Sequence, residues 1–544
     1  MNNKNTSLLE NELRQRSIDV MACFEANQSG YQPISFQSSE TKTIETMVSE
    51  TFNQLKRNCD IVEGTTGLVD VTNQRIAVLF SGGPAAGGHN VIAGLKAVLG
   101  DGHCLFGVKS GPKGLLEGDL FELTNDSVST IKNLGGFDFL GSDRTKIKTE
   151  EQFAKVKKTV LDYQLDGIII IGGDDSNTNA AMLAEYLFDV NCSVVGVPKT
   201  IDGDLRVNGL LPISFGFDTA TKIYAEMVGN ILQDTPSSQK YWHFVKLMGR
   251  SASHVTLEVA LQTKPAVSFI SEEVKSSNKT LSQLVDYIVD AIVIRHQQGM
   301  NYGVVLIPEG LIEFIPAMTQ LISELNDQVG HVDTSLPLND RLNALKAHLS
   351  SESFSNLSSL PAFIQEELLA ERDSHGNLKV SQIPTELLLM EMVNVRLSNQ
   401  HPEIPFAANP HFFGYEGRCG APSCFDASYT YNLGLIAGSL VLNKFTGYMA
   451  AIDHFQGVPR ALGIPLTTLI VSERRHNKDE LVIEKALVKL DSPSFKYFSQ
   501  NRQEWMKSDC FNSPGPRQFW GPISKQLPIS IAMDLGYDDL IYSF

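Results

Sequence analysis

The segment that constrains this chain most is the apolar run Asp166-Gly-Ile-Ile-Ile-Ile, followed at once by the turn Gly172-Gly-Asp-Asp-Ser. Four consecutive isoleucines predict a strand covered on both faces, which is typical of a parallel sheet. Such sheets bind ligands at the carboxyl ends of their strands, where this turn stands. Glycines let the backbone approach phosphate oxygens, and Asp174 could hold a Mg²⁺ that bridges them. The second carboxylate, Asp175, repels a polyphosphate unless cations offset it, which indicates selection against some ligands.

A second glycine-rich turn follows an apolar run earlier in the chain. Residues 75–80 (Arg-Ile-Ala-Val-Leu-Phe) lead into residues 81–90 (Ser-Gly-Gly-Pro-Ala-Ala-Gly-Gly-His-Asn), and a helical pattern begins at Val91. This order predicts a strand, a turn and a helix. The turn suits a phosphate, although a tight strand-to-helix connection accounts for the same glycines equally well. Strands and helices keep alternating through Ser193-Val-Val-Gly-Val-Pro, so we expect an α/β sheet.

A third turn, Pro198-Lys-Thr-Ile-Asp-Gly-Asp, places a lysine, a hydroxyl and two carboxylates behind a strand. Phosphoryl transfer needs a base near the accepting hydroxyl, positive charge over the transferred group and a metal on the donor. Asp202 fits the base and Lys199 the cation, while Asp204 could orient Asp202 or reach the metal through water. Each residue alone is also compatible with an ordinary Asp turn. Two such turns at consecutive strand ends favour a phosphoryl-transfer site.

The 544 residues are enough for more than one domain. We expect an α/β fold with two Rossmann-like domains. The pattern predicts an N-terminal helical extension (1–70), a first α/β domain (71–235), a second α/β domain (236–311 and 403–470), a helical insertion (312–402) and a C-terminal segment (471–544) that packs back on the body. In the first domain, Asp218 is placed to cap a helix that runs through Ile231.

Composition narrows the partners and the compartment. A net charge of −17 and a pI near 5.2 argue against nucleic acid and anionic membranes as partners. The polar opening does not resemble a secretory signal, and no apolar run reaches the roughly 20 residues that span a bilayer. Seven cysteines are too scattered for a disulfide framework, which fits a reducing compartment. We therefore expect a cytoplasmic protein.

Taken in order, the motifs resemble those of a known family. They are residues 81–83 with 87–90, Gly172-Gly-Asp-Asp-Ser, Pro198-Lys-Thr-Ile-Asp-Gly-Asp, Met248-Gly-Arg-Ser-Ala-Ser-His, Pro308-Glu-Gly and Gly414-Tyr-Glu-Gly-Arg. From about residue 70 to beyond 470 the chain resembles the phosphofructokinases, specifically the long-form, pyrophosphate-dependent type. The resemblance implies reversible phosphoryl transfer from pyrophosphate to the 1-hydroxyl of fructose 6-phosphate, giving fructose 1,6-bisphosphate and phosphate.

The resemblance also implies roles in the donor half. Residues 71–235 become the donor-binding domain, with Gly82, Asp175 and Lys199 at the pyrophosphate, Asp174 on Mg²⁺ and Asp202 as the general base. In ATP-using relatives, glycines stand where this chain has Asp175 and Lys199. A carboxylate at 175 intrudes where a nucleotide's α-phosphate would pass, and a lysine at 199 offers charge to a short inorganic donor.

For the sugar, the resemblance makes residues 236–311 and 403–470 the sugar-phosphate-binding domain. The implied substrate residues are Thr200, Ile201, Asp202, Lys240, Tyr241, Met248, Gly249, Arg250, Glu309, Tyr415 and Arg418, with Arg250 also counted as catalytic. Arginine's planar fork suits the 6-phosphate expected at Arg418. Lys240 and Tyr241 match a position that reaches a neighbouring subunit's sugar site, which implies a homodimer or homotetramer with shared active sites.

Two departures from the family pattern bear on the donor loop. Pro84-Ala-Ala replaces a more usual Gln-Ala-Pro order, and Asp143 stands where a glycine usually precedes Arg144, which affects a phosphate role for Arg144 and Lys146. Three alternatives stay open: a catalytically silent regulatory subunit, an ATP-dependent phosphofructokinase, and a more distant lipid or NAD kinase. A silent subunit should lack a catalytic group that this chain retains. Asp175 and Lys199 argue against an ATP donor, and the sugar motifs argue against the distant kinases.

Overall fold

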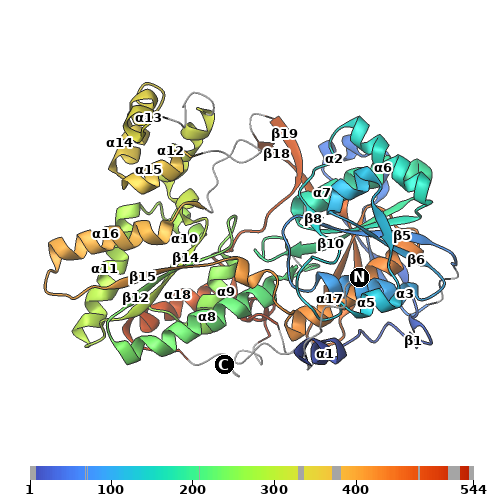
Figure 1. Cartoon of the computed structure of the whole chain (residues 1–544), viewed down its shortest axis with the longest axis horizontal. Helices are drawn as coiled ribbons and strands as arrows, with labels where there is room; N and C mark the ends of the chain where they lie inside the picture. Colours follow the sequence, from blue (N-terminus) through green and yellow to red (C-terminus); the bar gives the residue numbers. More distant parts are fainter. Residues whose placement is uncertain are drawn as a thin grey trace. The chain divides into compact units, whose positions relative to one another are not determined.

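A computed structural model describes residues 8–67, 69, 71–207, 209–328, 336–370, 382–475, 478–511 and 527–537. The chain forms two compact units (Figure 1). Unit 1 comprises Met1–Lys222, Glu416–Ala486 and Arg517–Pro528, and unit 2 comprises Ile223–Tyr415, Leu487–Pro516 and Ile529–Phe544. Both units are mixed α/β, which confirms the expected fold class. Parts of the predicted N-terminal extension, helical insertion and C-terminal segment lie outside the described residues.

One long mixed sheet forms the centre of unit 1. Its strands lie in the order β3 (Ser35–Thr41), β4 (Asp60–Thr65), β17 (Arg460–Pro465), β16 (Tyr448–Asp453), β10 (Ser193–Thr200), β9 (Gly167–Gly172), β5 (Arg75–Ser81), β6 (Cys104–Val108) and β7 (Leu120–Glu122). Short strands β8 (Ser142–Asp143) and β11 (Phe215–Gly216) pair with β5 and β10. The central strands from β16 to β6 run parallel, and the outer ones run antiparallel to their neighbours.

Helices cover both faces of this sheet, as the isoleucine run predicts. Helices α6 (Glu150–Tyr163) and α7 (Asp174–Tyr186) lie on one side, and α3 (Gly88–Leu99) and α17 (Cys424–Leu442) lie on the other (Figure 1). Residues Ile168 to Ile171 of β9 are each at most 4% exposed. A strand buried on both faces has no polar side to present, which is why its sequence shows no alternation.

Three expectations need correction in unit 1. Residues 416–470, expected in the second domain, lie in unit 1, because β16 pairs with β10 and β17 extends the same sheet. The N-terminal region is only partly helical, with α1 (Leu8–Gln15) and α2 (Thr46–Thr51), since β3 and β4 lengthen the sheet. Strand β3 is mostly exposed and polar on both faces, so no apolar pattern marks it. Asp218 lies inside the first turn of α8 (Phe217–Ser238) instead of capping it, although the helix runs through Ile231 as expected.

Unit 2 is built on a four-stranded parallel sheet. Its order is β13 (Val267–Ser268), β14 (Gly303–Pro308), β12 (Trp242–Leu247) and β15 (Ala408–Phe413). Helices α10 (Ser271–Ser276), α11 (Leu281–Gln297) and α16 (Thr385–Gln400) lie on one side in Figure 1, and α8, α9 (His254–Thr263) and α18 (Pro493–Lys507) lie on the other. The helical character of the insertion is confirmed where it is described, in α12 (Pro316–Asp327), α13 (Leu338–Leu345), α14 (Ser351–Ser359), α15 (Ala362–Leu368) and α16.

The C-terminal segment contributes to both units. Strand β18 (Ile470–Arg475) forms a hairpin with β19 (Lys478–Ile483), and residues 484–486 follow in unit 1. Helix α19 (Ile529–Asp534) then packs in unit 2, where the buried carboxylate of Glu258 accepts the backbone N–H groups of Ile529 and Ser530 at 2.8 and 2.7 Å. This clamp satisfies donors at the helix N-terminus.

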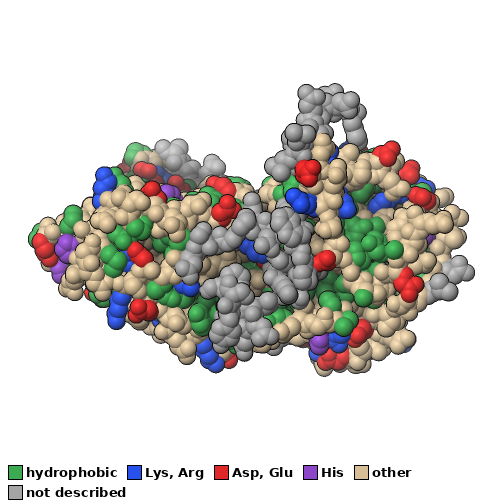
Figure 2. Space-filling view, turned by 90° about the horizontal axis from the view of Figure 1, so that it is seen from below, with side chains coloured by type: hydrophobic (Ala, Val, Ile, Leu, Met, Phe, Trp, Pro, Cys, Tyr) green, Lys and Arg blue, Asp and Glu red, His purple; other side chains and the backbone are tan. Residues whose placement is uncertain are grey.

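No helix among the described residues is long and apolar enough to cross a bilayer. On the face drawn in Figure 2, acidic and basic side chains are interspersed over a surface that is mostly uncharged.

Candidate functional site

The three predicted turns lie side by side in unit 1. Strand β9 pairs with β10 on one side and β5 on the other, all parallel, so their carboxyl ends share one edge of the sheet. A hydrogen bond of 2.8 Å from Ser176 Oγ to Ser81 Oγ joins the turn after β9 to the turn after β5. The register therefore brings the glycine turn, the paired carboxylates and the lysine–aspartate turn to one site, as the sequence predicts.

Gly82 lies in the turn after β5 and has a left-handed backbone conformation. Its φ of +84° is a backbone conformation that favours glycine, and an added Cβ would lie 3.4 Å from Lys199 Nζ. Its N–H donates to the Asp143 carbonyl at 2.8 Å, and Ser142 Oγ donates to its carbonyl at 2.6 Å. The N–H of Gly82 is therefore committed within the loop, and the positive φ is what favours glycine at this position.

Lys199 is a buried cation at the centre of these turns. It is 6% exposed, and burial is the main cause that lowers its pKa to about 8. The nearby Arg418 charge lowers the pKa further, whereas Asp202 and Asp174 raise it. A partly desolvated ammonium with room around it is suited to an incoming anion, which would restore the solvation it has lost.

The two carboxylates after β9 open helix α7 and face different partners. Asp175 is half-exposed and pairs with Lys146 at 2.8 Å. Asp174 Oδ2 lies 3.8 Å from Nζ of Lys485, a residue that the sequence pattern did not single out. Both carboxylates lie in the first helical turn, where the helix dipole favours negative charge. Lys146 offsets the charge of Asp175, so the donor site remains compatible with an anion.

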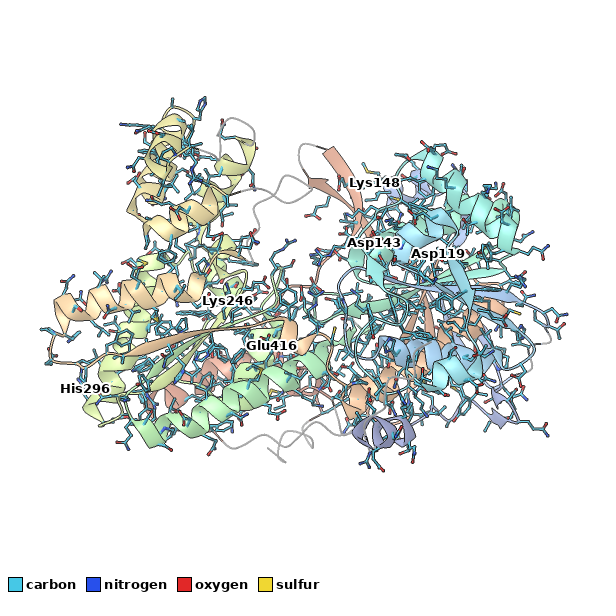
Figure 3. All side chains as sticks on the ribbon, in the orientation of Figure 1. Asp119, Asp143, Lys148, Lys246, His296 and Glu416 are labelled. Carbon is cyan, nitrogen blue, oxygen red and sulfur yellow. The ribbon has the colours of Figure 1, made fainter. Side chains whose placement is uncertain are left out.

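The carboxylate of Asp143, labelled in Figure 3, is held within its own turn. Its carboxylate accepts from Thr145 Oγ1 at 2.6 Å and from the backbone N–H groups of Thr145 and Lys113 at 3.1 and 3.2 Å. The turn thus accommodates Asp143 in place of the usual glycine, because its carboxylate is hydrogen-bonded to neighbouring groups of the same loop and of Lys113.

The turn from Thr200 to Asp204 is a compact hydrogen-bonded unit. The Asp202 N–H donates to Thr200 Oγ1 at 3.1 Å, and that hydroxyl donates to Asp204 Oδ1 at 3.2 Å. Gly203 has φ +72°, and Ile201 is buried. Burial and the adjacent Asp202 charge raise the pKa of Asp204, which is 6% exposed. The turn presents Asp202 as its more accessible carboxylate.

Arg418 lies against the donor loop in unit 1. Its Nε donates to the Pro84 carbonyl at 3.3 Å, and a Cβ on Gly83 would meet its Nη2 at 1.7 Å. The sequence grouped Arg418 with the 6-phosphate of the sugar, and that role stays a prediction. Its position adds a guanidinium to the cations around Gly82 and Lys199.

In unit 2, Met248, Gly249, Arg250 and Glu309 meet at the carboxyl ends of β12 and β14. Glu309 is 4% exposed and its Oε2 accepts from the Gly249 N–H at 2.9 Å. Gly249 has φ +134°, and a Cβ on Gly310 would lie 1.9 Å from the Arg250 carbonyl. The loop that carries the exposed Arg250 is therefore fixed by one buried carboxylate, by the left-handed backbone of Gly249 and by the close approach of Gly310.

Lys240 and Tyr241 stand at the opposite end of β12. Six strand residues separate them from Met248, about 20 Å at 3.3 Å per residue. The Lys240 ammonium lies 4.8 Å from the centre of the Tyr241 ring. Within one chain these two residues do not join the loop of Arg250.

Tyr415 is 74% exposed, and the backbone carbonyl of the preceding residue, Gly414, accepts a hydrogen bond from the Tyr224 hydroxyl.

The carboxylates at the strand ends of unit 1 are also compatible with a magnesium ion that binds together with a phosphate ligand. Within the described part of the chain, no cluster of three acidic, histidine or cysteine side chains is placed to hold a metal. Mg²⁺ is ordinarily bound by one or two carboxylates together with substrate phosphates and water. Asp174 is partly exposed at the start of its helix, and Lys485 lies close to both Asp174 and Asp204. These two carboxylates suit an ion of this kind.

Comparison with known proteins agrees with this architecture. The phosphofructokinase family profile matches residues 75–348. A "Pyrophosphate--fructose 6-phosphate 1-phosphotransferase" of Treponema pallidum is 48% identical over 464 residues, which cover 82% of this chain and 81% of the relative. The corresponding "subunit beta 2" of Arabidopsis thaliana is 47% identical over 85% of this chain and 82% of its own length.

A solved structure shares the fold. The pyrophosphate-dependent phosphofructokinase of Nitrosospira multiformis matches with a TM-score of 0.52 and 14% identity, over 83% of this chain and 95% of that one. The sequence similarity extends through both units and includes all three turns at the edge of the large sheet. This chain belongs to the phosphofructokinase family.

Proposed function

We propose that this protein transfers a phosphoryl group reversibly from pyrophosphate to the 1-hydroxyl of fructose 6-phosphate. The products are fructose 1,6-bisphosphate and phosphate. Relatives that carry this activity in their names share 47–48% identity over more than four fifths of the chain. The observation that carries the proposal is the presence of Asp175, Lys199 and Asp202 together at adjacent strand ends of unit 1. A silent subunit has no comparable support, because no expected catalytic group is missing.

Each group at the strand ends has a task in this reaction. Asp202 takes the proton of the 1-hydroxyl as its oxygen attacks the nearer phosphorus of pyrophosphate. The bridging P–O bond breaks, and the buried Lys199 stabilises the negative charge on the departing phosphate. Mg²⁺, held by Asp174, would supply charge neutralisation and orientation to the donor oxygens. Catalysis then depends mainly on positioning and electrostatics.

The preference for pyrophosphate follows from the size and charge of the donor site. Lys199 places a buried ammonium beside Gly82, where it can reach a short donor that has no adenosine to anchor it. The carboxylate of Asp175, at the start of α7, repels the third phosphate that ATP would bring. The ion pair with Lys146 reduces the repulsion between Asp175 and the two phosphates of pyrophosphate. The same pair of side chains thus favours one donor and disfavours the other.

The sugar contacts, assembly and compartment belong to the proposal as well. Met248, Gly249, Arg250, Glu309 and Tyr415 would line the sugar phosphate, with Thr200 and Ile201 near the transferred group. Strand β12, which separates Tyr241 from Met248 by about 20 Å, supports a site completed by Lys240 and Tyr241 of a second copy, in a homodimer or homotetramer. The acidic composition and scattered cysteines support a cytoplasmic enzyme.

The direct test is a forward assay with two donors. The full chain is supplied with fructose 6-phosphate and Mg²⁺, and formation of fructose 1,6-bisphosphate is measured with either pyrophosphate or ATP. We expect turnover with pyrophosphate and none with ATP. Turnover with ATP alone would refute the donor assignment, and inactivity with both donors would favour a regulatory subunit.

A further inference from the structure

Lys485 lies between two acidic residues of the donor half. Its Nζ is 3.8 Å from Asp174 Oδ2 and 3.8 Å from Asp204 Oδ2. Both distances are within ion-pair range but longer than a direct hydrogen bond, so the ammonium sits between the carboxylates without closing onto either. The charge of Lys485 opposes the shift that raises the Asp204 pKa. The family motifs end before this residue, and the forward mechanism does not assign it a role.

The backbone on both sides of Lys485 is attached to the elements that carry these carboxylates. The Ile483 N–H donates to Thr178 Oγ1 at 3.1 Å, and that hydroxyl donates to the Asp174 carbonyl at 2.9 Å. On the other side, the Ala486 N–H donates to the Asp204 carbonyl at 2.7 Å. These bonds hold the segment after β19 across the turns that follow β9 and β10. The placement of Lys485 therefore follows from the fold and does not depend on a flexible side chain alone.

We propose that Lys485 is a built-in counter-charge that competes with the divalent cation for Asp174 until the donor arrives. In the donor-free protein the Lys485 ammonium neutralises part of the charge of Asp174 and Asp204. The affinity of these carboxylates for a free divalent cation is therefore lowered. When a metal–pyrophosphate complex enters, Asp174 would hold the cation and the Lys485 ammonium would turn to an oxygen of pyrophosphate. Metal and donor then bind together. This inference rests on the proposed pyrophosphate site and adds a residue to it.

The proposal follows from charge balance. Removing the ammonium of Lys485 makes the charge around Asp174 and Asp204 more negative by one unit and therefore strengthens this site for a cation. A metal–pyrophosphate complex retains negative charge, so the cost of bringing it near Asp204 falls if an ammonium is close by. Lys485, 29% exposed in its side chain, is accessible enough to follow the ligand. Lys485 is thus expected to weaken the binding of a free divalent cation and to strengthen the binding of the metal–pyrophosphate complex.

The test measures metal binding without turnover. Mn²⁺, as a spectroscopic probe for Mg²⁺, is titrated by electron paramagnetic resonance into the full chain in the absence of pyrophosphate. Calorimetry then measures pyrophosphate binding at a fixed Mg²⁺ concentration. The variants are Lys485→Met, the charge-conserving Lys485→Arg, and Lys489→Met, which removes an exposed lysine four residues later. If the methionine variant does not fold, Lys485→Gln replaces it.

We expect Lys485→Met to bind Mn²⁺ at least tenfold more tightly than the wild type and to bind pyrophosphate at least tenfold more weakly. Lys485→Arg and Lys489→Met should stay within threefold of the wild type in both measurements. Unchanged or weaker Mn²⁺ binding by Lys485→Met would overturn the proposal. The donor-free titration reports on Lys485 even if the protein does not use pyrophosphate, whereas a wild type that binds no pyrophosphate would contradict the proposed function itself.

Discussion

Replacing Lys199 by methionine should make the protein more stable and abolish its use of the donor. The side chain is 6% exposed, and burial is the main cause that lowers its pKa from 10.5 to about 8. A lysine whose pKa falls on folding destabilises the native state, because the unfolded chain holds the proton more tightly. Methionine has a similar length and no charge, so Lys199→Met removes this cost with little change in volume.

The size of the effect follows from the two pKa values. The difference between 10.5 and about 8, at about 1.36 kcal/mol per pH unit, corresponds to about 3 kcal/mol. This cost is fully present below about pH 8 and disappears as the pH rises toward 10.5. We therefore expect Lys199→Met to raise the free energy of unfolding by about 3 kcal/mol at pH 7, with a smaller gain at pH 9.

Denaturant unfolding of the full chain, followed by circular dichroism at both pH values, measures this difference. Calorimetry with pyrophosphate and Mg²⁺ should show that Lys199→Met has lost donor binding. Lys246→Met is the matched control (Figure 3). Lys246 is 2% exposed, lies 3.1 Å from Glu386 and donates to the Ile383 carbonyl at 2.9 Å, so its removal leaves a buried carboxylate without its cation. That control should lose about 3 kcal/mol. Equal or lower stability of Lys199→Met, or retained donor binding, would refute the reasoning.

Three further outcomes follow from the same site and its supports. Asp202→Asn should lower kcat by roughly 10²- to 10⁴-fold with little change in the KM for fructose 6-phosphate, because a general base is lost and the turn is kept; steady-state kinetics would reveal a purely structural role as an equal loss of binding. Asp175→Gly with Lys199→Gly should weaken pyrophosphate use and admit some ATP turnover, and a folded double variant without ATP turnover would place donor choice elsewhere. Burial and the Asp218 charge raise the pKa of Asp426, so the native state keeps a proton that the unfolded chain releases, and stability should fall as the pH rises from the acidic range toward neutrality. Asp426→Asn should flatten that slope in denaturant unfolding, and an unchanged slope would assign it to other groups.

The local features of the fold were predictable from the sequence where one physical cause dominates. The isoleucine run of β9 predicts a doubly covered strand, and its glycine turn was expected at the carboxyl end of that strand, where the structure has it. Parallel pairing then brings three strand ends together, so the polar turns could be predicted to lie at one edge of the sheet, whereas the assignment of Gly82, Asp175 and Lys199 to the donor came from the resemblance to the family. The helices of the insertion follow from their amphipathic pattern.

Long-range placements were not predictable in this way. Strands β16 and β17 join the first sheet from residues 448–465, because pairing partners distant in sequence leave no local signal. The polar edge strand β3 lacks an apolar alternation. Lys485 reaches Asp174 only through the hairpin of β18 and β19, and no motif surrounds it. Aspartate is common at helix N-caps, but Asp218 lies inside α8, where its carboxylate accepts hydrogen bonds from Lys222 Nζ and Ser423 Oγ.

The measurement that tests the central claim most directly is the reverse reaction, followed by ³¹P NMR. The full chain is incubated with fructose 1,6-bisphosphate, phosphate and Mg²⁺ in the absence of any nucleotide, with Asp202→Asn as the control. We expect the pyrophosphate resonance to appear together with fructose 6-phosphate in the wild type and to be nearly absent in the variant. Absence of pyrophosphate in the wild type, or phosphoryl transfer only when ADP is added, would contradict a pyrophosphate-dependent enzyme.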